Sequence, residues 1–367
     1  MTRFFGLVFC WLVTSSAFAT HLLGGYIQAR RLTNTSLTYE FSVVLFMDER
    51  GGKMASQQQE VIDFCYGDGT PPVPVSRSER QFPFTDISVN TYRTIYTYPS
   101  AAPRTASVLL TYRPLGARNL LASTDQVLFY LETTIYPEAV NTTPAFALPD
   151  NVLQLPLNRP AVLPLATRDA EGDSVVYSLT RPRLSECGFA STSLPGYTYP
   201  NAVEQKGTLR IDPRRGVLSW NSPTSVGYYL LEVKAEEWRK GRKISETYLD
   251  LTVATRDLPG QPAAVLPPYE PVQEAPDNKF ELTGEDLIVT VYPVPVQGTL
   301  NVLLRSAKPV KTQLHLLNGQ GELLGEFYPS NSVQERWEIN TRPLPAGVYL
   351  LRLQTPEKTY VQKFTKP

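Results

Sequence analysis

Alternation of apolar and polar residues in short runs is the feature that most limits how this chain can fold. In the run LTYEFSVVLFM, every second side chain from Leu37 to Met47 is apolar, and the residues between them are mostly polar until Val44. A period of two residues places these apolar side chains on one face of an extended strand. Similar runs recur as TASVLLTYR and DQVLFYLETTI, so we expect half-buried β-strands in the first part of the chain.

Turn-forming residues separate these runs and set the fold class. The 367 residues include 32 Pro, 22 Gly and 20 Tyr; Pro and Gly mark turns, and Tyr suits the half-buried surface of a sheet. A prior of roughly 150 residues per domain gives two or three domains. The predicted fold class is therefore all-β; the segments described below, and the families that they resemble, imply tandem immunoglobulin-like β-sandwich domains and a further β-sandwich at the C-terminal end. Lys and Arg together number 35 and so do Asp and Glu, so no strong field favours nucleic acid as a partner.

The first residues have the three parts of a secretory signal peptide. Arg3 is a short basic region, residues 4–13 are apolar, and Ala17-Phe18-Ala19 fits a cleavage site. The alternative is a buried N-terminal strand. The pattern predicts a signal peptide over 1–19 and a mature protein that begins at Thr20 and is exported from the cytoplasm.

Two cysteines remain after that segment, because Cys10 lies inside its apolar part. In an oxidising compartment Cys65 and Cys187 can form one disulfide. They lie in blocks of sequence that we expect to be different domains, so the bond requires those domains to dock. The sequence leaves both a disulfide and two buried free thiols open.

Residues 20–140 form the first block. In FCYGDGTPPVP, Asp68-Gly69 supplies the backbone geometry of a tight turn, which we favour over metal binding for Asp68. The segment YGDGT, followed by TIYTYPSAAPRTASVLLTY, resembles a polycystic-kidney-disease (PKD) domain, with Tyr66 in place of the usual Phe. The opening THLLGGYI is similar to that of large surface proteins of gliding Gram-negative bacteria.

Residues 141–257 form the second block. It contains RDAEGDSVVYSL, then IDPRRGVLSW and a long strand pair that turns at Arg239-Lys240-Gly241. These pieces fit an immunoglobulin-like sandwich. In the same order they resemble the cadherin-like repeats of bacterial surface proteins.

A proline-rich linker over 258–285 leads to a third block, 286–367. Six prolines between Pro259 and Pro276, without periodic apolar residues, predict an extended spacer. The block contains LIVTVYPVPVQGTLNVLL, QLHLLNGQGELLGEF and PLPAGVYLLRL. It resembles the type A C-terminal sorting domain of type IX secretion cargo, which implies the type IX secretion machinery as a partner. The alternative is a third adhesive sandwich.

Motifs that carry chemistry are scarce. The two histidines are His21 and His315, and the sequence contains no G-x-x-x-x-G-K-[ST], no G-x-G-x-x-G after a strand and no H-E-x-x-H. Nucleophilic hydrolysis, phosphate chemistry and zinc catalysis therefore lack their usual residues. We expect no enzymatic activity, no catalytic residues and no organic cofactor.

One acidic loop is a candidate calcium site. Asp169, Glu171 and Asp173 alternate on a tight loop, and Glu236 in a later strand is a fourth candidate ligand. Carboxylate oxygens that converge on one point suit Ca²⁺, which takes six to eight oxygen ligands. The alternative, which the irregular spacing favours, is that Asp169 and Asp173 hydrogen-bond turn backbone.

Two tryptophans, Trp220 and Trp238, could stack on sugars, but their strand positions favour the core.

Together these features predict a secreted, non-enzymatic protein of the cell surface or extracellular space that passes through the periplasm. The resemblances imply adhesion to an unknown surface ligand, either a polysaccharide or a protein. The alternative function is a polysaccharide-acting enzyme or an accessory carbohydrate-binding module. A deep groove lined by two carboxylates and aromatic rings would favour the enzyme.

Overall fold

The structure of the chain is a computed structural model with side chains. It describes residues 22–366 except 112, 114–115, 122–126, 138–139, 148–152, 222, 258–264, 275–279, 284–286, 293 and 297. The predicted signal peptide lies outside the described residues. In the described part no helix is long and apolar enough to cross a bilayer.

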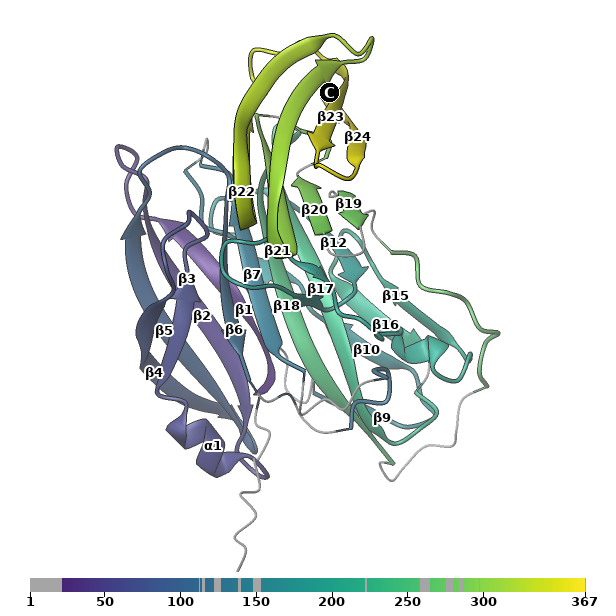
Figure 1. Cartoon of the computed structure of the whole chain (residues 1–367). Coiled ribbons are helices and arrows are strands. Elements are labelled where there is room, and N and C mark those ends of the chain that lie inside the picture. The colour runs from purple at the N-terminus through teal and green to yellow at the C-terminus, as the bar shows by residue number, and fades with distance from the viewer. Residues whose placement is uncertain are drawn as a thin grey trace, which may run out of the picture.

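One large sheet dominates the first 256 residues, and its strands are antiparallel except at β9 (Figure 1). Alternating apolar residues form these strands, as the sequence predicts, and the all-β fold class is confirmed. In sheet order the strands are β1 (Leu22–Arg31), β2 (Thr38–Asp48), β5 (Ile87–Thr97), β4 (Val73–Phe84), β3 (Val61–Cys65), β6 (Arg104–Leu110), β7 (Phe129–Ile135), β18 (Arg242–Arg256), β17 (Gly227–Arg239) and β12 (Ser174–Thr180), with β9 (Gln154–Pro156) parallel to β18.

Strand β18 closes this sheet around the first core. It pairs with β7 through Thr247 and with β1 through Leu251, so β1 and β7 meet on the same strand. The close approach depends on glycine: a Cβ at Gly24 would lie 2.4 Å from the carbonyl oxygen of Asp250, and one at Gly25 would lie 2.5 Å from that of Val44. Only residues without side chains can occupy these two positions.

Two apolar cores lie on this sheet. The first is built entirely from residues 22–135, including Phe41, Phe64 and Phe129. The second draws on residues 117–253 and also takes in Tyr26 and Phe46 from the first block. The predicted boundary at residue 140 falls between β7 and the next strand, yet the sheet continues across it, and the two predicted domains share β18.

Shorter elements cover the second core or connect strands. They are α1 (Lys53–Gln58), η2 (Pro200–Ala202), the sheet of β10 (Ala161–Pro164), β16 (Val217–Asn221) and β15 (Thr208–Ile211), and the pairs β8 (Ala145–Phe146) with β11 (Thr167–Arg168) and β13 (Arg183–Leu184) with β14 (Thr192–Ser193).

The third block forms a separate sheet with its own core. Its apolar centre uses only residues 287–364, including Val302, Leu351 and Phe364. Strand β24 stands at one end of the strand order, and a long curved hairpin of β21 and β22 rises above the body (Figure 1). The strands are β19 (Phe280–Thr283), β20 (Leu287–Tyr292), β21 (Thr299–Asn318), β22 (Leu323–Asn340), β23 (Gly347–Gln354) and β24 (Thr359–Lys366).

Within the predicted linker, 258–285, residues 280–283 form strand β19 of the third sheet, and residues 265–274 have no regular secondary structure but are attached to the body. Glu270 donates its N–H to Gly207 and its carbonyl accepts from Asn201, while Glu274 pairs with Arg181. This segment is therefore held against the second core, whereas its composition predicts a free spacer.

A buried cluster of charges connects β7, β17 and β18 with β13. Arg113 and Asp250 form an ion pair at 2.7 Å with both side chains 0% exposed. Arg183 pairs with Glu132 at 3.1 Å and with Glu232 at 3.3 Å. Burial raises the pKa of Glu232 to about 8, although Arg183 opposes the shift. Three carboxylates and two guanidiniums share this space, so protonation of Glu232 balances the charge.

We expect the stability of the fold to depend on pH through Glu232. Its pKa is about 8 in the folded state against an ordinary value of 4.5, so between these values the folded protein keeps a proton that the unfolded chain has lost. The free energy of unfolding should fall by up to about 1.4 kcal/mol per pH unit as the pH rises through this window. Glu232→Gln should reduce the slope by this amount in urea titrations from pH 5 to 8, and Glu237, whose pKa is also raised, contributes the rest. Glu79→Gln, at a side chain 38% exposed, is the control, and an unchanged slope in Glu232→Gln would contradict the assignment.

Candidate functional site

The acidic loop predicted from the sequence forms a tight turn into β12. The Oδ1 atom of Asp169 accepts a hydrogen bond from the backbone N–H of Asp173 at 2.5 Å. Gly172 has a φ of +79°, a conformation that glycine adopts without strain. Asp169 therefore has the turn role that we favoured from the sequence. The turn brings three acidic side chains together where β12 begins.

A fourth carboxylate reaches the loop from β17. Asp169, Glu171, Asp173 and Glu237 each offer an oxygen, and these four oxygens lie within 4.8 Å of one another. Glu237 is 0% exposed. Its Oε1 atom and the Oδ2 atom of Asp169 are both buried and accept no hydrogen bond from an N–H or hydroxyl group of the described residues, and the two carboxyl groups interact with each other. We refer to these four residues as the acidic cluster.

Neutral and cationic groups surround the acidic cluster. Asn141 and Ser245 both donate hydrogen bonds to Oε2 of Glu237. Arg239 donates to both carboxylate oxygens of Asp173, at 2.8 and 2.5 Å, and to Oδ1 of Asn141. One guanidinium therefore faces four carboxylates.

The electrostatics of the acidic cluster are those of crowded carboxylates. Burial, and next the interaction with Asp169, raise the pKa of Glu237 to about 9. With no cation present, Glu237 holds a proton at neutral pH. Chemically, the cluster can share a proton between two carboxyl groups or bind a cation through oxygen ligands.

Glu236, which we assigned to this site from the sequence, is not part of it. Successive side chains of a strand point to opposite faces, and Glu236 forms ion pairs with Lys234 at 3.1 Å and Lys243 at 3.3 Å. Its neighbour Glu237 occupies the position beside Asp169. The expected residue type was correct, but the face of the strand was wrong.

Other residues that the sequence singled out have structural roles. Asp68 accepts hydrogen bonds from Thr70 and from the hydroxyl of Tyr96, as a turn residue does. Trp220 is buried in the second core, edge-on to Tyr229. Trp238 is partly exposed at the end of β17.

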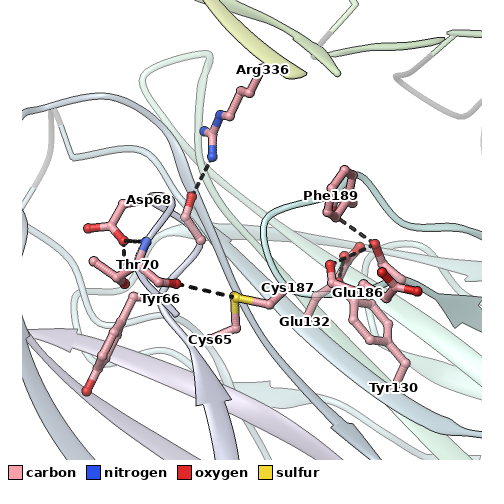
Figure 2. Close-up of a disulfide and its surroundings, with 12 residues drawn as sticks. Cys65, Tyr66, Asp68, Thr70, Tyr130, Glu132, Glu186, Cys187, Phe189 and Arg336 are labelled. Carbon is pink, nitrogen blue, oxygen red and sulfur yellow. Dashed lines mark hydrogen bonds between the residues drawn. A yellow bond between two sulfur atoms is a disulfide. The ribbon is translucent and has the colours of Figure 1, made fainter. Parts of the chain in front are cut away.

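Cys65 and Cys187 form a disulfide, with Cα atoms 5.5 Å apart across a sequence separation of 122 residues (Figure 2). It joins the end of β3 to the segment that runs between β13 and β14. The docking of the two blocks that this pairing requires is provided by the shared sheet.

The third block contacts the body beside this disulfide. Arg336 on β22 donates a hydrogen bond to the carbonyl oxygen of Gly67 at 2.7 Å (Figure 2). Arg104 and Glu338 form an ion pair at 2.7 Å. A small cavity lies at this contact, lined on one side by Phe189 of the disulfide-bonded segment and on the other by strands β20 and β21. The third block therefore rests on the body.

A larger cavity, of about 320 Å³, lies at the opposite end of the body, where β2 and β18 end and β5 begins. Its volume is at the lower end of the range for small-molecule sites, about 300–1,000 Å³. The buried hydroxyl of Thr252 lines it without a hydrogen-bond partner among the described residues. Its wall combines apolar, aromatic and charged side chains, among them Leu23, Asp48, Arg50, Asp86, Tyr228 and Arg256. We call it the distal groove.

Comparison with known proteins identifies the third block. Residues 290–366 match the family described as "Secretion system C-terminal sorting domain". No curated protein matches the chain.

Two solved structures are similar over most of the chain but weakly. Dimeric latent PorU from Porphyromonas gingivalis is 10% identical, with a TM-score of 0.20, over 95% of this chain and 34% of that one, so this chain spans about a third of its length. The BSP domain of a biofilm-associated protein is 11% identical, with a TM-score of 0.17, over 96% and 68% of the two chains. At these TM-scores neither supports an argument about this chain.

The fold and the family match define an exported all-β protein. The third block is a sorting domain, so the protein is a cargo of type IX secretion that is delivered to the cell surface or the extracellular space.

Proposed function

We propose that this protein is a non-enzymatic binding protein of the cell surface or extracellular space, and that it holds an acidic polysaccharide in the distal groove. The observation that carries this proposal is the position of the groove. It opens at the end of the body away from the sorting domain, so a chain attached through its sorting domain presents the groove outward.

The side chains of the groove suit a saccharide with carboxylate groups. Arg50 and Arg256 are exposed at the groove, and guanidinium groups pair with carboxylates in a bidentate manner. Tyr228 offers an aromatic surface against which a sugar ring can pack.

Binding is favoured over cleavage because one of the two carboxylates in the groove is already engaged. The two oxygens of Asp48 accept hydrogen bonds from the backbone N–H groups of Arg50 and Gly51. Both oxygens of Asp48 are therefore used to hold the turn that follows β2. Asp86 alone does not provide the pair that glycoside hydrolysis uses.

Binding of the full chain to an array of acidic and neutral polysaccharides tests this proposal. We expect retention of acidic glycans, about tenfold weaker binding for Tyr228→Ala and for Arg256→Ala, and no release of reducing ends. The matched controls are Tyr328→Ala, at a side chain 93% exposed in the sorting domain, and Arg93→Ala on β5. Equal binding by all four variants, or the appearance of reducing ends, would contradict the proposal.

A further inference from the structure

We propose that the acidic cluster is a calcium site whose ligands are Asp169, Glu171, Asp173 and Glu237, and that bound calcium stabilises the junction of β12 with β17. This inference does not depend on the distal groove or on its ligand.

Burial distinguishes this cluster from a set of surface acids. Glu237 is 0% exposed, and its Oε1 atom accepts no hydrogen bond from an N–H or hydroxyl group of the described residues. The Oδ2 atom of Asp169 is also buried and accepts no hydrogen bond from an N–H or hydroxyl group of the described residues. Buried polar atoms are nearly always paired in folded proteins; without an ion these two oxygens can share the proton of Glu237, and a cation between them would replace that proton.

The size of the cluster is compatible with calcium. The four oxygens lie within 4.8 Å of one another. Calcium bonds oxygen at about 2.3–2.6 Å, so ligands on opposite sides of the ion are roughly 4.6–5.2 Å apart, whereas magnesium requires roughly 4.0–4.2 Å. The four oxygens therefore fit around calcium without rearrangement of the backbone.

Further oxygen atoms can complete the coordination. Calcium takes six to eight ligands, and carboxylates of the cluster can bind through both oxygens. Oδ1 of Asn141 is close by, because it accepts from the same Arg239 that contacts Asp173. Glu171 is exposed, so solvent reaches the ion from its side.

Arg239 is the internal competitor of the ion. It contacts both oxygens of Asp173, and its side chain is 31% exposed, so it has room to turn away. Two positive charges compete for one set of carboxylates. Removal of the arginine should therefore strengthen calcium binding, whereas a purely structural role for the loop predicts only a loss of stability.

Thermal unfolding and calorimetric titration of the chelator-treated full chain test the site, with calcium chloride as the probe. We expect the Tm to rise by about 3 °C or more at a hundredfold excess over Kd, and a smaller rise with magnesium. Glu237→Gln and Asp169→Asn should each abolish the shift. Glu236→Gln, one residue away on the other face of β17, should retain it.

Arg239→Ala provides a test in the opposite direction, with a Kd for calcium about tenfold lower than that of the unchanged chain. If Glu237→Gln does not fold, loss of the shift in Asp169→Asn decides the matter. The absence of a calcium-dependent shift in the unchanged chain, an equal loss in Glu236→Gln, or weaker binding by Arg239→Ala would each overturn the proposal.

Discussion

Removing the disulfide should be among the most destabilising changes that this protein can undergo. Replacement of Cys65 and Cys187 by alanine opens a covalent loop across a sequence separation of 122 residues. On the loop-entropy account, this lowers the free energy of unfolding by about 4–5 kcal/mol. We expect a matching fall in the midpoint of urea unfolding under oxidising conditions.

The single variants are the internal control. Because loss of either sulfur breaks the bond, Cys65→Ala, Cys187→Ala and the double variant should be destabilised to a similar degree, and reducing agent should lower the unchanged chain to the same level. Independent, additive losses for the two single variants would contradict a bond between them. Unchanged stability of the double variant would do so as well.

Deletion of residues 286–367 should have the largest effect on location. The sorting domain has an apolar core that shares no residue with the two cores of the body, so the truncated protein should still fold. It should accumulate in the periplasm, whereas the unchanged chain reaches the surface or the medium. Cell fractionation and protease accessibility of intact cells measure the difference.

A fusion provides the complementary test of sorting. Residues 286–367 attached to an unrelated exported reporter should bring that reporter to the surface or the medium of a host with the type IX machinery. The same fusion in a host without that machinery is the control. Surface delivery of the truncated protein at the level of the unchanged chain would assign the third block to adhesion instead.

The sequence predicted the features that depend on local pattern. Alternation of apolar residues, as in β2, defines strands directly, and the turn at Asp68 follows from the local chemistry of Asp and Gly. The third block was identified because its motifs are short and occur in a fixed order. Each of these predictions requires only residues that are near one another in the chain.

Features that depend on distant pairing were not predicted. The contact of β1 with β18 requires Gly24 to lie against Asp250, and no local pattern specifies such a partner. The sequence therefore indicated two separate domains and a free linker, whereas the structure has a shared strand and a linker segment attached to the second core.

The sequence contained a signal that distinguishes Glu237 from Glu236, although we assigned Glu236 to the site. On β17 the odd-numbered residues Tyr229, Val233 and Ala235 belong to the second core, and Glu237 continues that face. A carboxylate in line with core residues is an unusual position. The parity of the strand could therefore have identified Glu237 as the buried member of the pair.

The shared strand also determines how the body bears mechanical load. Tension from the sorting domain first reaches the attached linker segment, through Arg181 and Asn201, and enters the body at Arg256, where β18 ends, once those contacts have broken. Strand β18 is hydrogen-bonded to β17 on one side and to β7 and β1 on the other. A pull along its axis loads these bonds in shear, so many must break together rather than one after another. The arrangement therefore resists extraction of β18 from the body.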